Sequence, residues 1–267
     1  MTVRSRVASR PPADAQRRRL ADLGWVVVAA VVFLGAWKAV VVVGGYPVFI
    51  LPAPEVVGAR WWTAWTSGLM TPHTVTTLAE IAAGFAIGAT AAVLVGYLLA
   101  RSRLVERLLS PYLVAAQATP VLALAPLIAL WFGSGALSKV IICSLIVFFP
   151  VAVATMVGIR SVDAGLLELG RSLRATRRQV FAKLEIPAAL PAILGGMRVG
   201  VTLAVIGAII GEWTGGETGL GVLINLARGS LFDIPLLFAT LLTIALIGVA
   251  LYLAVLLVER RLVGARA

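Results

Sequence analysis

Residues 163–191 have the sequence DAGLLELGRSLRATRRQVFAKLEIPAALP, and they form the one long polar segment of a chain that is otherwise largely apolar. The apolar residues of this segment recur at helical spacing, which predicts two short amphipathic helices rather than a solvated basic loop. Asp163 is placed to cap the first helix, and Thr176 to cap the second, with Gln179 completing a capping box. Pro187 is expected to end the second helix, because proline disfavours helical geometry at the residue before it.

The composition identifies an integral membrane protein. Of the 267 residues, 60% are hydrophobic and only 13% are charged, whereas soluble domains carry about 25% charged residues. Several apolar runs reach the length of about 20 residues that a membrane span requires, which argues against a large soluble core. The single Cys, Cys143, and the single His, His73, exclude a disulfide framework and a Cys/His metal site.

We predict an all-α polytopic protein with six membrane spans in one domain, residues 23–267, preceded by a disordered basic tail over residues 1–22. The run from Trp25 to Val43 is too long for a signal peptide, so it is expected to be an uncleaved first span, with Lys38 snorkelling near its outer end. A short interfacial helix rich in Trp is expected in the outer segment 44–72. The other five spans are expected at about 74–100, 112–132, 140–159, 193–213 and 236–258.

The distribution of basic residues predicts the orientation in the membrane. Eighteen Arg and Lys residues lie in the tail, in two alternate loops (101–111 and 160–191) and at the C-terminal end, whereas the opposite segments hold only Arg60 and Arg228. This positive-inside signal places both termini and the 160–191 loop in the cytoplasm, with the chain in the plasma membrane. The net charge of +11 is therefore attributed to topology, not to nucleic-acid binding.

Few polar side chains are expected at membrane depth. Glu80 is expected to make an interhelical hydrogen bond, Lys139 to snorkel outward, and His73 to lie at the membrane interface. Arg198 fits either lipid headgroups or a brace for the 160–191 loop. The residues proposed for a translocation pathway are Trp131, Phe132, Glu212 and Trp213.

Two further features concern the backbone. Pro120 and Pro126 are expected to kink the third span where it is buried in protein or lines a cavity. The outer loop after the fifth span contains four glycines that permit a tight re-entrant turn, at positions 215, 216, 219 and 221.

The 163–191 segment resembles the coupling loop of ATP-binding-cassette (ABC) importer permeases. That loop follows the pattern E-A-A, three residues, Gly, nine residues, I-x-L-P. Here Glu168-Leu169-Gly170 stands for E-A-A, and Leu184-Glu185-Ile186-Pro187 stands for I-x-L-P at the expected distance. Arg174 replaces the family's Gly just after the first short helix, where a left-handed residue is favoured; Arg adopts that conformation at some cost.

This resemblance implies that the loop docks on a separate ATPase subunit. The contact residues would be Glu168, Gly170, Arg171, Leu173, Ala175 and Thr176, with Arg174 and Pro187 completing the motif. The chain has no G-x-x-x-x-G-K-[ST] phosphate-binding loop, because its three lysines follow Trp, Ser and Ala. We therefore expect a non-catalytic subunit without a cofactor of its own, with ATP bound by the partner.

A second stretch, Thr119 to Asp163, is similar to the permeases of nitrate, sulfonate and taurine importers. The matching positions are Pro120, Pro126, Trp131-Phe132-Gly133, Ser138-Lys139 and Phe148-Phe149-Pro150. Gly211-Glu212-Trp213 followed by Gly219-Leu220-Gly221 is more like the branch that imports thiamine-precursor pyrimidines, with riboflavin importers close by.

The implied function is the permease subunit of an importer for a small organic solute, either a thiamine-precursor pyrimidine or riboflavin-like compound, or a sulfonate, taurine or nitrate. The implied partners are two ATPase subunits, an extracellular solute-binding protein and a second copy of the chain. A stand-alone channel or secondary transporter would leave the capped basic loop unexplained, and no inverted repeat is seen. An intramembrane enzyme would need clustered His, Asp, Cys or Ser residues.

Overall fold

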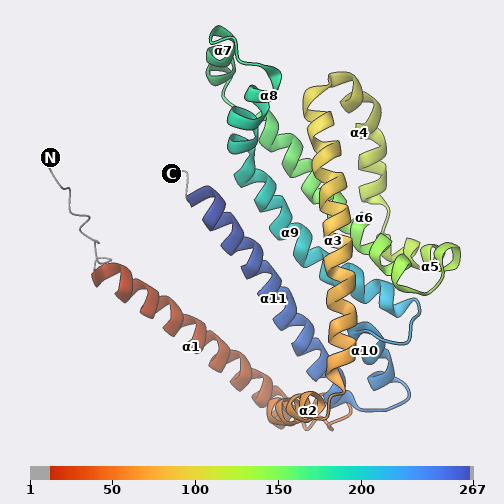
Figure 1. Ribbon diagram of the computed structural model, residues 1–267. Helices are drawn as coiled ribbons and strands as arrows, with labels where there is room; N and C mark the ends of the chain where they lie inside the picture. Colours follow the sequence, from red (N-terminus) through yellow and green to blue (C-terminus); the bar gives the residue numbers. More distant parts are fainter. Residues whose placement is uncertain (1–12, 265–267) are drawn as a thin grey trace.

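The computed structural model describes residues 13–264, and the described residues form helices joined by short turns, with no β-strand among them (Figure 1). The helices are α1 (Ala13–Gly44), α2 (Pro54–Thr66), α3 (Met70–Arg101), α4 (Arg103–Ala118), α5 (Val121–Phe132), α6 (Ala136–Arg160), α7 (Ala164–Ser172), α8 (Arg177–Val180), α9 (Ile186–Trp213), α10 (Leu220–Arg228) and α11 (Ile234–Gly264). A π-turn, Phe181–Glu185, joins α8 to α9.

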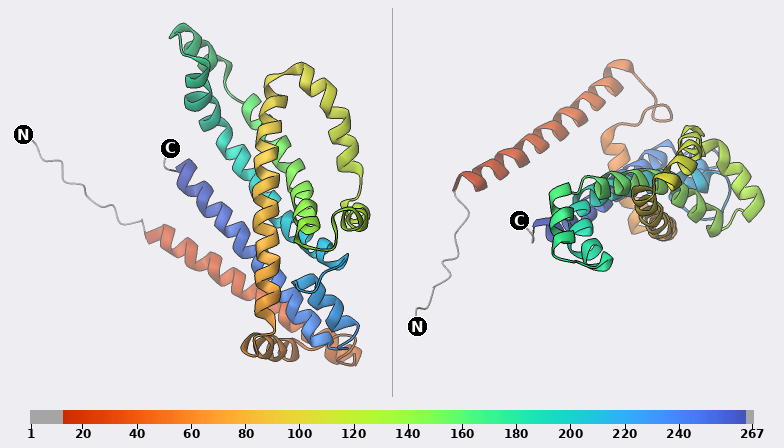
Figure 2. Two further views of the ribbon diagram at one scale, coloured as in Figure 1. Left: turned by 45° about the vertical axis from the view of Figure 1, so that its right-hand side comes forward. Right: turned by 90° about the horizontal axis from the view of Figure 1, so that it is seen from above.

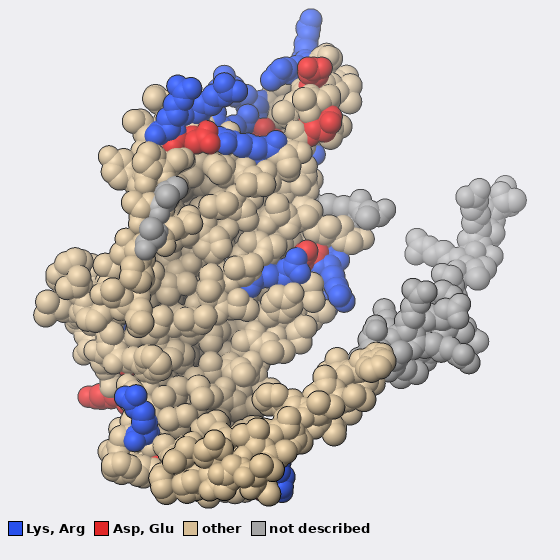
Figure 3. Space-filling model, turned by 180° about the vertical axis from the view of Figure 1, so that it is seen from behind, with Lys and Arg blue, Asp and Glu red and all other residues tan. Residues whose placement is uncertain are grey.

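Five helical segments are long and apolar enough to cross a membrane, and the bent pair of α4 and α5 makes a sixth if it is counted as one span. The prediction of an all-α polytopic protein is therefore confirmed. On the face shown in Figure 3, much of the surface between the two ends is uncharged, and Lys and Arg gather at the end that carries α7 and α8. The cytoplasmic orientation of that end stays a prediction.

The first span lies at the edge of the helix bundle. The predicted span lies within α1, which stands apart from the other long helices along much of its length (Figure 2). It contacts α2, and it also contacts α11 through Trp37 and Phe238, whose ring centroids are 5.8 Å apart. Lys38 near the outer end of α1 pairs with Glu55 of α2 at 2.7 Å, and both side chains are exposed. The helix α1 begins at Ala13, within the stretch 1–22 for which a disordered tail was predicted; residues 1–12 lie outside the described part, and the tail stays a prediction.

The third span differs from the prediction. Instead of an inside loop over 101–111 and one kinked helix over 112–132, α4 begins at Arg103 and turns into α5 through a bend of 95°. Ser102 caps α4 by accepting a hydrogen bond from the backbone N–H of Val105 at 3.3 Å. Pro120 forces Thr119 into an extended conformation (φ −78°, ψ 121°), so α4 ends there.

The second short helix does not end at Pro187, which corrects another prediction. The helical path runs from α8 through the π-turn into α9, and the Ile186 N–H donates to the carbonyl of Phe181, five residues earlier. Proline has no N–H to donate, but in the first turn of a helix this loss is tolerated. The wider π-turn therefore lets Pro187 follow without breaking the helix.

The outer loop 215–235 contains a helix, which the sequence analysis missed. Gly215, Gly216 and Gly219 have positive φ angles of 148°, 135° and 140°, so the tight turn expected there is confirmed. After this turn α10 packs Leu220 and Leu223 into a buried cluster with residues of α2, α3 and α11. Because its apolar face is buried in the protein, α10 forms part of the fold and is not a free loop.

The centre of the bundle is α6, which packs most extensively against α3 and α9. Small residues make this packing close. A Cβ added at Gly88 would lie 2.5 Å from the carbonyl oxygen of Ser144, and one added at Gly96 would lie 2.5 Å from that of Ala152. Backbone therefore rests directly on backbone along α3 and α6.

Replacing Gly88 by valine should lower the stability of the folded protein. The added side chain meets the α6 backbone, which cannot move aside like the end of a flexible side chain, and overpacking of this kind costs about 1–3 kcal/mol. Gly248→Val in α11 is the matched control, since a Cβ there meets nothing within 4 Å. Thermal unfolding in detergent measures the effect; equal midpoints for the two variants would contradict the close packing described here.

Candidate functional site

The α7–α8 segment is built by the local hydrogen bonds that its sequence predicted. The carboxylate of Asp163 accepts from the Leu166 N–H at 3.0 Å and caps α7. The hydroxyl of Thr176 accepts from the Gln179 N–H at 3.3 Å, while the Thr176 N–H donates to the Gln179 side chain at 2.8 Å. Both predicted caps are confirmed, and they define where the two short helices begin.

The connection between α7 and α8 has the expected left-handed residue. Arg174 has a φ of 53°, the conformation that the family's Gly favours. The next N–H, that of Ala175, donates to the Gly170 carbonyl at 2.9 Å, so the end of α7 is closed by a backbone bond. Arg174 keeps the turn in register, and its own side chain is exposed.

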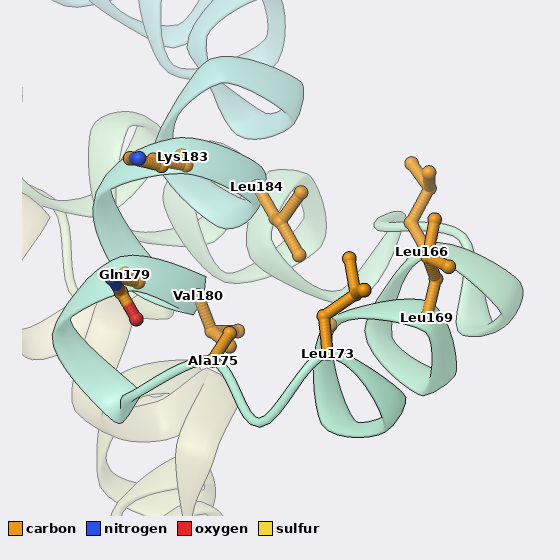
Figure 4. Close-up of a pocket in the computed structure, with 9 residues that line it drawn as sticks. Leu166, Leu169, Leu173, Ala175, Gln179, Val180, Lys183 and Leu184 are labelled. Carbon is orange, nitrogen blue, oxygen red and sulfur yellow. The ribbon is translucent and has the colours of Figure 1, made fainter.

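The two helices enclose an apolar groove of about 290 Å³. Figure 4 shows Leu169 and Leu173 of α7 on one side, facing Val180 and Leu184 on the other. Gly170 forms the floor, where an added Cβ would lie 3.2 Å from Leu184. Leu173 is 73% exposed and Leu169 is 55% exposed, so large apolar side chains face outward at the basic end of the molecule. Such a patch is typical of a protein–protein contact.

The structure divides the predicted loop residues into three groups. Gly170, Leu173 and Ala175 line the groove. The exposed residues at its rim are Glu168, Arg171, Arg174 and Thr176. Pro187 is half-buried in α9 and does not line the groove, so it belongs to the base of the segment. Sequence reasoning missed Val180 and Leu184 as groove residues, although their helical spacing had been noted.

A second site, which is polar, lies inside the bundle where α3, α6 and α9 meet. Lys139 of α6 has its ammonium nitrogen 3.3 Å from a carboxylate oxygen of Glu80 on α3, and both side chains are at most 5% exposed. The prediction that Lys139 snorkels outward is therefore wrong: a buried acid on a neighbouring helix gives it a partner within the protein. The interhelical contact expected of Glu80 is present as an ion pair.

Glu212 of α9 joins this site to the turn before α10. Its carboxylate accepts a hydrogen bond from the Thr77 hydroxyl and one from the Gly221 N–H, both at 2.5 Å. The Gly219 N–H donates to the ring of His73 at 3.1 Å, and His73 is buried in the protein. Its position at the membrane interface stays a prediction. We call Glu80, Lys139 and Glu212 the buried charge cluster; it holds three spans and the re-entrant turn together.

Residues 84–264 match the family described as binding-protein-dependent transport system inner membrane component. The chain belongs to this family of ABC permeases. It is therefore a multi-pass inner-membrane protein, and the resemblance seen in the 163–191 segment is confirmed. Members of the family are transport components without catalytic activity of their own.

Similar proteins serve several solutes. The permease is 47% identical to the riboflavin transport system permease protein RibX of Chloroflexus aurantiacus over 88% of each chain. It is 37% identical to the formylaminopyrimidine transport permease protein ThiX of Halalkalibacterium halodurans, over 78% of this chain and 82% of that one. It is 33% identical to the putative aliphatic sulfonates transport permease protein SsuC of Bacillus subtilis, over 90% and 87%.

Solved transporters share the fold. An inward-facing structure of the MetNI methionine ABC transporter aligns with a TM-score of 0.64 at 19% identity, covering 73% of the permease and 98% of that chain. An amino acid ABC transporter aligns with a TM-score of 0.56 at 22% identity, covering 75% and 96%. At this level of identity the likeness concerns the arrangement of the helices.

The four residues proposed for a translocation pathway are not brought together within the permease chain. Trp131 and Phe132 end α5 and are 69% and 50% exposed. Trp213 ends α9 and is about half exposed, while the side chain of Glu212 beside it turns inward to the buried charge cluster. Glu212 therefore has a positioning contact in this structure, and the pathway assignment stays a prediction for all four residues.

Arg198 has a different partner from either of those expected. Its guanidinium lies 2.9 Å from the carboxylate of Glu259 on α11, and both side chains are less than one-third exposed. This pair joins α9 to the last span. The sequence showed Glu259 only as an acid just beyond an apolar run. Its pairing with Arg198 could not be predicted, because the two residues are 61 positions apart.

Proposed function

We propose that this permease is the membrane-spanning subunit of an ABC importer, and that α7 and α8 form the coupling loop on which a separate ATPase subunit docks. The observation that carries the proposal is the outward-facing apolar groove between Leu173 and Leu184, held by two capped helices at the basic end of the molecule. A contact that must transmit force needs a preformed shape, and the caps provide it.

The importer would contain two copies of the permease and two ATPase subunits, with ATP bound by the ATPases. Each permease chain offers one α7–α8 groove, so a two-fold assembly presents one groove to each ATPase. An extracellular solute-binding protein would deliver the solute to the end that carries α2 and α10. ATP binding would then change the relative stability of two arrangements of the spans, because the ATPases contact the grooves differently in each.

For the solute we propose riboflavin or a thiamine-precursor pyrimidine. The similarity to RibX at 47% identity and to ThiX at 37% supports a planar heteroaromatic compound over the aliphatic sulfonate in the name of SsuC at 33%. The motif Gly211-Glu212-Trp213 points to the same branch. Its Glu212 supports the re-entrant turn, so the motif is tied to the outer part of the fold.

Uptake into proteoliposomes tests both levels of the proposal. The permease is reconstituted with its ATPase and its solute-binding protein, and labelled riboflavin, formylaminopyrimidine and an alkanesulfonate are offered with ATP or with a non-hydrolysable analogue. We expect riboflavin or the pyrimidine to accumulate with ATP and not with the non-hydrolysable analogue. Accumulation of the sulfonate would support the importer function but refute the proposal that the solute is a heteroaromatic compound. Uptake by the permease without its partners would identify a channel and contradict the proposal.

A further inference from the structure

The base of the α7–α8 segment is attached to the inner end of α3. The last turn of α3 carries Tyr97 and Arg101, which lie far from the segment in sequence. Arg101 donates to the carboxylate of Glu185 at 2.8 Å. Glu185 is only 4% exposed, whereas the Arg101 side chain is 44% exposed, so the pair is buried on the side of the acid and open to solvent on the side of the arginine.

The same turn of α3 also holds the other end of the π-turn. The ring of Tyr97 packs edge-to-face on Phe181, with ring centroids 5.0 Å apart. Arg101 is fixed between the two contacts, because its Nε donates to the Tyr97 hydroxyl at 3.1 Å and its guanidinium lies 5.6 Å from the ring centroid. The first and last residues of the π-turn are thus both bound to one turn of α3.

The π-turn also receives the packing of α7. Gly170 at the floor of the groove lies against Leu184, which belongs to the π-turn itself. A partner that presses on the groove therefore acts on Leu184, and through its neighbour Glu185 on Arg101. π-turns have looser hydrogen bonding than α-helix and recur at functional sites, which suits a segment that changes shape under load.

From α3 the contact continues along the whole molecule. The inner half of α3 rests on α6 through Gly96, and the outer half carries Glu80 of the buried charge cluster and Thr77, whose hydroxyl donates to Glu212. A movement imposed on Arg101 thus reaches the re-entrant turn through one rigid helix.

We propose that Tyr97 and Arg101 are positioning residues that transmit movement of the α7–α8 loop to α3, with Glu185 and Phe181 of the π-turn as their contacts. The inference rests on the proposed function, since it needs an ATPase on the loop. The inference adds a defined contact between the loop and α3. The loop moves α3 through one ion pair and one aromatic pair, in addition to its covalent connection to α9.

The test measures whether α3 moves when the ATPase does. Spin labels replace Leu94 on α3 and Leu253 on α11, which are 62% and 47% exposed, in a chain that also carries Cys143→Ala. The permease–ATPase complex in nanodiscs is studied without nucleotide and trapped with ADP and vanadate. Dilution with unlabelled chain restricts the measured distances to one subunit.

Charge reversal separates the ion pair from general effects on folding. We expect the label distance to change on trapping in the parent chain, the change to be lost in Arg101→Glu with the ATPase still bound, and Arg101→Glu/Glu185→Arg to restore it. Arg101→Lys, which keeps the charge, should retain part of the change and replaces the double variant if that does not fold. Arg103→Glu is the matched control, because Arg103 is exposed on the same end and should behave as the parent chain does.

The outcomes distinguish the inference from the proposed function. A parent chain that does not bind the ATPase overturns both. Binding with an unchanged label distance in the parent chain overturns the inference alone, as does an Arg101→Glu variant that moves like the parent. Loss of movement that neither the reversed pair nor Arg101→Lys repairs also overturns it, because the charge contact would then not be the element that transmits movement.

Discussion

Replacing Leu173 by aspartate should weaken binding of the ATPase subunit by about 30-fold or more while the permease stays folded. Leu173 is 73% exposed at the edge of the apolar groove, so it contributes little to packing within the permease. In the complex it would be buried, and a carboxylate there would lose its hydration without gaining a partner. A hot-spot loss of about 2 kcal/mol corresponds to that change in affinity.

Co-purification with the tagged ATPase and titration by microscale thermophoresis measure this effect. Leu231→Asp is the matched control: Leu231 is 53% exposed on the turn between α10 and α11, at the other end of the molecule. It receives the same charge change but should bind the ATPase as the parent chain does. Unchanged binding by Leu173→Asp, or equal loss in both variants, would show that the groove is not the docking site.

Replacing Lys139 by methionine should be strongly destabilising. The substitution leaves the buried carboxylates of Glu80 and Glu212 without the cation of their cluster, in a region that water does not reach. Both carboxylate oxygens of Glu80 are buried without a hydrogen-bond partner among the described residues, so Lys139 is the group that offsets their charge. Removing one partner of a buried pair costs about 3–5 kcal/mol.

Unfolding in mixed micelles of a mild detergent and sodium dodecyl sulfate reports this loss. Lys38→Met is the matched control, because the pair of Lys38 with Glu55 is more than half exposed on both sides; such pairs contribute about 0–1 kcal/mol. The double variant Lys139→Met/Glu80→Gln removes the uncompensated acid and should recover much of the stability. A Lys139→Met variant as stable as Lys38→Met would refute the assigned role of the cluster.

The features that the sequence predicted well are those determined by near neighbours in the chain. Asp163 and Thr176 cap their helices through bonds to residues three positions away, so the caps could be predicted without knowledge of the fold. Arg174 was expected in a left-handed conformation from its place after α7, and it is found there. The apolar spans likewise follow from composition over about 20 residues.

The features that were missed depend on partners far away in sequence. Lys139 was expected to reach the membrane surface, but Glu80, 59 residues earlier, gives it a buried partner that a local pattern cannot indicate. The helical path through Pro187 depends on a π-turn whose ends are held by α3. The helix α10 is short, and tertiary packing of Leu220 and Leu223 stabilises it more than local propensity does.

Photo-crosslinking in living cells shows directly whether the ATPase docks on the α7–α8 groove. A photoreactive amino acid is placed at Leu173 in one strain and at Phe232 in another; Phe232 is 82% exposed on the turn between α10 and α11. We expect a crosslink to the ATPase from position 173 and none from position 232. A crosslink to the ATPase from position 232, or from neither position, would contradict docking on this groove.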